Sequence, residues 1–111
     1  MSSRDWQNRV QDILGCAKNI VRFTDSMSFD TFINDPKTIR AVAFELTTIG
    51  EAAKAIPFEI QQIHTTIPWR KLQGIRNILI HEYFRLDEEI LWKTAKEDIP
   101  VLIINLENIL D

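Results

Sequence analysis

Apolar residues recur at steps of three and four along most of the chain, a spacing that places them on one face of an α-helix. The first such stripe lies between Arg4 and Met27, and the second follows Pro36 and runs to about Ile56. The sequence holds only three glycines and four prolines, which leaves little material for turns. These features predict a few long helices and disfavour an all-β fold, which needs many short strands.

Prolines set the boundaries of the second long helix. Pro36 suits the first turn of a helix, where its missing N–H donor costs nothing, and Pro57 ends the helix. Residues 28–35 predict a short helical turn before it, and residues 58–67 predict a short helix and a loop after it. His64 falls in that second connection, and we expect it to be an ordinary exposed histidine.

Two further helices complete the pattern. One is expected from Pro68 to about Phe84, and Asp87 is a good N-cap for the last one. Pro100 should kink or break this last helix. The sequence therefore predicts an all-α protein in which residues 1–111 form a single domain, an antiparallel four-helix bundle with additional short helices.

Composition indicates where such a chain resides. No run of 18 apolar residues occurs, and the N-terminus lacks the apolar stretch of a signal peptide. We expect a cytoplasmic protein that does not enter a membrane. Cys16 is the only cysteine, so an internal disulfide and a cysteine-based metal site are excluded. Its apolar neighbours on the first helix predict that Cys16 is a small core residue.

Charge is unevenly distributed along the chain. Residues 68–86 carry four cations against one carboxylate, a local net charge of +3 that leaves −6 on the remainder of a chain whose net charge is −3. The overall charge argues against a protein that coats nucleic acid nonspecifically. A local basic segment on an acidic body suits a confined anionic ligand, although a merely solvated run of charge remains an alternative.

The helical wheel of residues 68–84 places Arg76 among the apolar positions of that helix, which are Trp69, Leu72, Leu79 and Ile80. A buried guanidinium needs a partner. One interpretation is therefore a core arginine paired with Glu51 or Glu45 of the preceding helix. The other is an arginine at the edge of a cleft that presents its planar fork to a phosphate.

His81 follows Arg76 by five residues, about 140° around an ideal helix. Asn77 lies one turn before His81 on the same side, so Arg76 and His81 should flank a groove. A lone histidine on a polar helix face is usually a surface residue. The combination with Arg76, Asn77 and Tyr83 within eight residues instead favours a functional site.

These side chains suit RNA cleavage by the strand's own 2′-OH. A histidine titrates near neutrality and can accept the 2′-OH proton or deliver a proton to the leaving oxygen. An arginine stabilises the charge that develops on the phosphoryl oxygens. This chemistry needs neither a metal nor a cofactor, and the two widely separated histidines and scattered carboxylates suggest no metal site. No glycine-rich phosphate loop or serine triad signature occurs.

The string from Arg76 to Tyr83 resembles the Arg-x-x-x-x-His-x-Tyr signature of the HepT-like HEPN proteins. The upstream Ile49-Gly50-Glu51-Ala52-Ala53 is similar to the Gly-Glu-Ala helix of that family, and it is also a small-residue patch that another helix can approach closely. Pro68-Trp69, Asp87 and residues 100–110 fall where the family places similar residues, so the resemblance spans nearly the whole chain.

The resemblance implies a homodimer with a composite cleft where two signature helices meet. It implies the toxin of a toxin–antitoxin pair, a metal-independent endoribonuclease in which Arg76 and His81 are catalytic and Asn77 and Glu51 support them. It further implies a nucleotidyltransferase antitoxin of the MntA type that transfers AMP to Tyr83.

Two other interpretations of the sequence remain open. The chain could be a noncatalytic helical dimer that serves as partner or regulator of a nucleotidyltransferase. It could also be a generic helical interaction domain in which Arg76 and His81 are structural and Tyr83 packs with a buried hydroxyl bond. The sequence leaves the RNA target and the cleavage site open.

Overall fold

The computed structural model describes residues 3–79 and 85–111, and every helix or strand assigned in those ranges is a helix. The elements in order are α1 (Ser3–Thr24), α2 (Phe29–Ile33), α3 (Pro36–Lys54), α4 (Phe58–Ile63), α5 (Trp69–Gln73), α6 (Ile75–Leu79), α7 (Glu88–Lys93), the π-helical turn η2 (Thr94–Asp98) and α8 (Ile99–Leu110). The predicted all-α fold is confirmed.

The helix α1 ends at Thr24, before the predicted limit at Met27. Ser26 has a φ of 62°, a left-handed conformation that a right-handed helix does not continue through. Ser28 then begins α2, because its side chain accepts a hydrogen bond from the backbone N–H of Thr31 at 3.2 Å and forms a capping box with that residue. The short helical turn expected over residues 28–35 is confirmed as α2.

The start of α3 follows from its cap. The carboxylate of Asp35 accepts hydrogen bonds from the hydroxyl of Thr38 at 2.8 Å and from its backbone N–H at 3.1 Å. These bonds favour the charged carboxylate and lower the pKa of Asp35 below its ordinary value of 3.8. Pro36 occupies the first turn, as predicted, and α3 ends at Lys54, shortly before Pro57.

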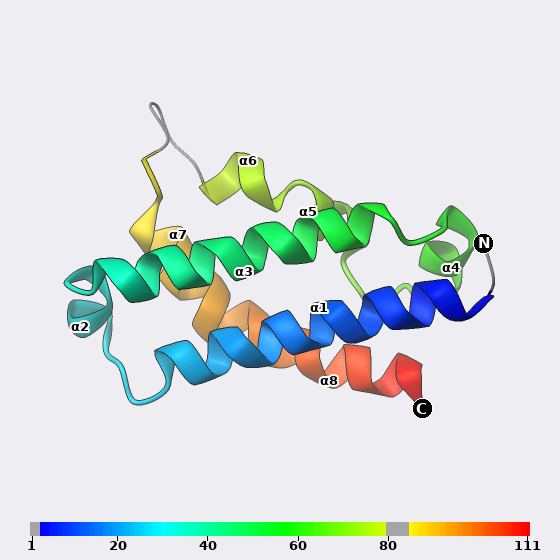
Figure 1. Cartoon of the computed structure of the whole chain (residues 1–111), viewed down its shortest axis with the longest axis horizontal. Coiled ribbons are helices and arrows are strands. Elements are labelled where there is room, and N and C mark those ends of the chain that lie inside the picture. Colours follow the sequence, from blue (N-terminus) through cyan, green and yellow to red (C-terminus); the bar gives the residue numbers. More distant parts are fainter. Residues whose placement is uncertain (1–2, 80–84) are drawn as a thin grey trace.

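Figure 1 shows α3 running between α1 on one side and the α5–α6 segment on the other, with α8 beside α1. Between these helices lies one cluster of buried apolar side chains. Its fully buried members are drawn from α1, α2, α3, the loop before α5, α6, α7 and α8, and the largest are Ile13, Ile20, Phe32, Leu46, Ile49, Ile67, Leu79, Leu91, Ile99 and Leu106. The apolar stripes predicted for the two long helices therefore face the core.

The small-residue patch on α3 has the predicted role. A Cβ atom built at Gly50 would lie 2.8 Å from the backbone oxygen of Leu72 and 3.1 Å from Cγ2 of Ile75. No side chain fits at that distance, so α5 and α6 come this close to α3 only because residue 50 is a glycine. Gly50 thus fixes the position of the segment that carries the candidate site.

The single helix expected over residues 68–84 is wrong at Gly74, where the structure ends α5 and begins α6. The Gly74 N–H donates to the carbonyl of Arg70 at 3.1 Å, and the Gly74 carbonyl accepts from the N–H of Asn77 at 3.1 Å. Glycine is a poor helix former, and it marks the point where the chain changes direction along α3. Residues 80–84 of the expected helix lie outside the described residues.

The last helix begins and breaks as predicted. The side chain of Asp87 accepts a hydrogen bond from the N–H of Ile90 at 3.0 Å and caps α7. The break associated with Pro100 takes the form of η2, a π-helical turn directly before α8. A proline ring collides with the carbonyl four residues earlier, here that of Lys96, and a widened turn at this point relieves the collision.

Two single-residue expectations change. His64 is half-buried instead of exposed, with its ring 5.5 Å from that of Trp6 and its carbonyl accepting the indole N–H of Trp69 at 3.0 Å. Cys16 is only half-buried at the edge of the core. Burial, then the hydrogen bond and charge of Glu45, raise the pKa of its thiol to about 12. None of the helices in the described ranges is long and apolar enough to cross a membrane.

Candidate active site

The helix α6 presents the first part of the signature to solvent. Its residues Ile75 and Leu79 are buried, and this one-turn spacing fastens the helix to α3 and α7. The three residues between them, Arg76, Asn77 and Ile78, are exposed. The helix is therefore held from one side and displays Arg76 and Asn77 on the other.

The interpretation of Arg76 as a buried, paired arginine is wrong. Arg76 is exposed, and it has no ion pair or hydrogen bond from its side chain within residues 3–79 and 85–111. The two carboxylates considered as partners are engaged elsewhere: Glu51 lies 3.5 Å from the Lys54 ammonium, and Glu45 accepts from Asn19 at 3.3 Å. The helical wheel placed the buried Trp69, Leu72 and Leu79 on the correct face, but Arg76 lies at the edge of that stripe and remains exposed.

Glu51 and Arg76 belong to different surfaces in the structure. Glu51 is exposed and lines a shallow hollow between α1 and α3, together with Arg9, Asp12 and Asn19. No hydrogen bond or ion pair among the described residues joins Glu51 to Arg76. The structure therefore does not bring together the supporting carboxylate and the arginine that the sequence suggested it would serve.

The other two signature residues, His81 and Tyr83, lie outside the described residues. The backbone N–H of Asp87 donates to the carbonyl of Leu79 at 2.8 Å, so the end of α6 and the start of the last helix are joined directly.

Positive charge is available around this point. The four cations of the basic segment, Arg70, Lys71, Arg76 and Arg85, are all exposed. Lys71 forms an ion pair with Asp98 at 3.3 Å, whereas the other three have no ion pair in the part of the chain that the structure describes. An exposed and unpaired guanidinium keeps its donors free for a phosphate.

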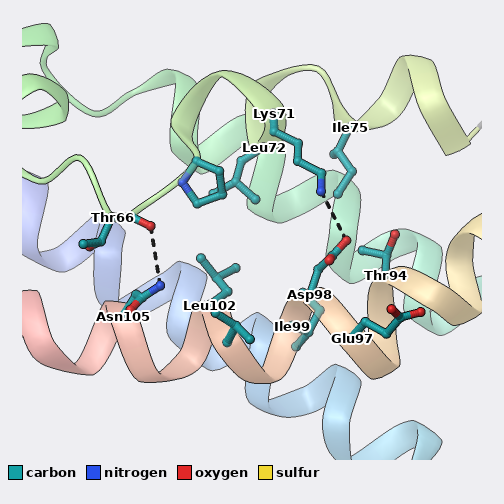
Figure 2. Close-up of a pocket in the computed structure, with 12 residues that line it drawn as sticks. Thr66, Lys71, Leu72, Ile75, Thr94, Glu97, Asp98, Ile99, Leu102 and Asn105 are labelled. Atoms are coloured by element: carbon teal, nitrogen blue, oxygen red, sulfur yellow. Dashed lines mark hydrogen bonds and ion pairs between the residues drawn. The ribbon is translucent and has the colours of Figure 1, made fainter.

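Sequence reasoning missed a cavity of about 260 Å³ that separates α5 from η2 and α8. Figure 2 shows the polar and apolar side chains that line it and two polar links between its walls, Lys71 to Asp98 and Asn105 to the carbonyl of Thr66. These links join α5 to η2 and the loop before α5 to α8. Among the described side chains, no three histidine, cysteine, aspartate or glutamate residues group closely enough to hold a metal ion.

Comparison with known proteins places this arrangement in a family. Residues 13–109 match the family model described as "Ribonuclease HepT-like". The chain is 43% identical over 99 residues to "Probable ribonuclease HepT" of Thermococcus cleftensis, which covers 89% of this chain and 90% of that protein. It is 40% identical over 100 residues to an RNase candidate of Methanocaldococcus jannaschii, covering 90% of this chain and 92% of the relative.

A bacterial relative extends the comparison. An RNase candidate of Caldanaerobacter subterraneus is 36% identical over 101 residues, covering 91% of this chain and 90% of that protein. No solved structure matches the chain. The family model spans most of the described helices, from within α1 to within α8, and the relatives are matched over nearly their whole length. The chain therefore belongs to the HepT-like ribonuclease family.

Proposed function

We propose that this protein is a metal-independent endoribonuclease in which Arg76 and His81 catalyse attack by a 2′-OH on the adjacent phosphate. The observation that carries the proposal is the exposed guanidinium of Arg76, which has no partner among the described residues and lies on an anchored helix five residues before the histidine. Family membership supports the class of activity. The exposed cations on the same segment support an RNA substrate, because phosphate contacts dominate nucleic-acid affinity.

The proposed reaction is an internal transfer at phosphorus. Neutral His81 accepts the 2′-OH proton, the 2′ oxygen bonds to phosphorus, and the bond from phosphorus to the 5′ oxygen breaks. The leaving oxygen takes a proton, which gives a 2′,3′-cyclic phosphate on one product and a 5′-OH on the other. Arg76 donates hydrogen bonds to the nonbridging oxygens, where negative charge grows in the transition state. Asn77, exposed beside Arg76, is proposed to add a hydrogen bond to the same phosphate.

The proposed biological role is the toxin of a toxin–antitoxin pair that acts in the cytoplasm. Two copies would meet along residues 68–84 and form a composite cleft. The partner antitoxin would be a nucleotidyltransferase that modifies Tyr83. In that step the Tyr83 oxygen attacks the α-phosphate of ATP, the bond to the β-phosphate breaks, and pyrophosphate leaves. The attached AMP would occupy the place of an RNA phosphate beside Arg76 and block the substrate by space and charge.

The decisive experiment compares purified wild type with His81→Ala and Arg76→Ala on a labelled RNA in the presence of a chelator. Wild type should retain its cleavage, and each variant should lose most of it, because a positioned proton-transfer group contributes about 10²–10⁴-fold. The products should carry 2′,3′-cyclic or 3′-phosphate ends. His64→Ala is the matched control, since it removes the other histidine and should leave the cleavage rate intact.

Each part of the proposal has its own contradicting result. Undiminished cleavage by His81→Ala, or complete loss of wild-type cleavage in chelator, would overturn the mechanism. A monomer in light scattering at micromolar concentration would overturn the composite cleft. Intact mass after coexpression with the nucleotidyltransferase tests the switch, and a Tyr83→Phe variant that still gains AMP would place the modification elsewhere. Modification of Tyr83 in a protein without ribonuclease activity would instead favour a noncatalytic partner of that enzyme.

A further inference from the structure

A second feature of the basic segment is a groove between α4 and α5 that the proposed reaction does not use. Its lining includes Phe58, Gln61 and Gln62 from α4 and Trp69, Arg70 and Lys71 from α5, and it contains no carboxylate. We call this surface the α4–α5 groove. Most of the surface of the α4–α5 groove is apolar, and its two charged lining residues, Arg70 and Lys71, are both positive.

Phe58 supplies an open aromatic face in the α4–α5 groove. It begins α4 directly after Pro57, and 68% of its surface is exposed. A phenylalanine at the rim of a groove leaves a flat apolar face in contact with water. Nucleic-acid bases that are not paired stack on such faces, and every base has a π-face that can do so.

The two glutamines of the groove differ in their hydrogen bonding to the described residues. The amide of Gln61 donates to the carbonyl of Ile56 at 2.9 Å and accepts from Gln73 at 3.4 Å, which fixes the wall. Gln62 is exposed, and its side chain makes no hydrogen bond to the described residues, so both ends of its amide remain available to a base edge.

The two cations of the groove differ in whether a carboxylate among the described residues pairs with them. Lys71 is committed to Asp98 at 3.3 Å. Arg70 is exposed and forms no ion pair within the described ranges, so its planar fork is free for a phosphate. Trp69, held by its indole N–H bond to the carbonyl of His64 at 3.0 Å, forms the buried wall behind it.

We propose that the α4–α5 groove binds single-stranded RNA, with a base stacked on Phe58 and a backbone phosphate paired with Arg70. This inference rests on the proposed function and adds a substrate contact outside the reacting phosphate. Arg70 lies on α5 and Arg76 on α6, on either side of the break at Gly74, and both are exposed. The protein therefore selects an unpaired strand, because a base inside a duplex has no free face for Phe58.

Binding of RNA, measured apart from cleavage, tests the inference. Fluorescence anisotropy of a labelled 12-nucleotide single strand is followed in the His81→Ala background, where the RNA stays intact. Adding Phe58→Ala should weaken binding by about 5- to 150-fold, the effect of losing one base–aromatic stack. Adding Arg70→Ala should reduce the slope of log affinity against log salt by about 0.7, the value for one phosphate contact to a single strand.

Matched controls lie on the exposed side of α3. Phe44 is 70% exposed, nearly the same as Phe58, and Arg40 is an exposed arginine, but neither lines the α4–α5 groove. Phe44→Ala and Arg40→Ala should leave the affinity for the 12-nucleotide strand unchanged.

Several results would overturn the inference. These are unchanged affinity in Phe58→Ala, an equal loss in Phe44→Ala, or an equally tight fully paired RNA. No binding of the single strand by any variant would also overturn it. If Phe58→Ala changes the oligomer mass in light scattering and leaves RNA affinity intact, the groove is a protein interface. Binding that depends on Phe58 in a protein whose wild type does not cleave RNA would support the groove and refute the proposed reaction, so the two failures are distinguishable.

Discussion

The two sides of α3 are built differently. Along its packing with α1 and the rest of the core, α3 contributes Val42, Leu46 and Ile49, each with 0% of its surface exposed. On the side that faces α5 and α6, the contact depends on the missing side chain of Gly50. The first interface joins two long unbroken helices, and the second joins a long helix to two short ones that end and begin at Gly74.

This difference separates stability from chemistry. Full burial of aliphatic side chains supplies most of the free energy that holds α1 and α3 together. The α5–α6 segment buries enough apolar surface to be held in place, through Leu72, Ile75 and Leu79, and it keeps Arg70 and Arg76 in water. Residues that bind a substrate must stay accessible, so they cannot share the burial that stabilises the core. We expect substitutions on the two sides to have opposite consequences.

The largest expected contrast is between Arg76→Ala and Leu46→Ala. The first should lower the rate of RNA cleavage by about 10²–10³-fold, the cost of removing one donor to a developing oxyanion. It should change the free energy of unfolding by less than about 0.5 kcal/mol, because Arg76 is exposed and unpaired among the described residues. Leu46→Ala should lower the free energy of unfolding by about 2–5 kcal/mol. Urea denaturation and a cleavage assay measure both, and an Arg76→Ala protein as unstable as Leu46→Ala would erase the contrast.

The next contrast uses two helical glycines as a matched pair. Gly50→Ala places a methyl group 2.8 Å from the Leu72 oxygen and should lower the free energy of unfolding by about 1–3 kcal/mol. Gly15→Ala, on α1, meets nothing within 4 Å and should raise it by up to about 1 kcal/mol through better helix propensity. Thermal or denaturant unfolding of both variants decides the matter. Equal changes of the same sign would mean that the close approach of α5 to α3 is not tightly constrained.

The half-buried Cys16 at the edge of the α1–α3 interface should react slowly with thiol reagents. Because the pKa of Cys16 is raised to about 12, little thiolate exists at pH 8, and the thiolate is the reactive form. Alkylation by iodoacetamide should be slower than for an ordinary free thiol by roughly three orders of magnitude. The rate should recover in denaturant. The raised pKa also means that the stability contributed by the neutral thiol is lost as the pH rises through the alkaline range from about 9. Fast alkylation of the folded protein would contradict the raised pKa of Cys16.

The smallest expected effect is acid sensitivity at the cap of α3. The pKa of Asp35 is lowered in the folded state, so the unfolded chain binds more protons and stability rises with pH in this range. The contribution is present above an unfolded pKa near 3.8 and is lost as the pH falls through the lower folded value. Asp35→Asn keeps a good N-cap without the titrating group and should flatten this part of the curve of Tm against pH. If Asp35→Asn leaves the fall of Tm at acidic pH unchanged, the acid sensitivity comes from other carboxylates.

The sequence by itself determined which segments are helical and where most of them begin. These signals are local: a helix period repeats every few residues, and the caps at Asp35 and Asp87 bond to the backbone three residues on. The string from Arg76 to Tyr83 was equally readable, because a family signature is a property of the chain alone. The small residue at position 50 also predicted a close helix–helix contact, but the sequence did not identify α5 and α6 as the helices that make it.

The tertiary structure decided which face each helix buries. Leu72 and Leu79 are buried as the helical pattern indicates, whereas Arg76, at the edge of the same stripe, is left exposed by the packing, and the pattern alone does not settle such an edge position. The tertiary structure also pairs Glu51 with Lys54 and half-buries His64 against Trp6. It further joins α4 to α5 in one groove. Burial and pairing are relations between segments that are distant in sequence, and the energy that settles them comes from packing, which exists only once the helices have docked.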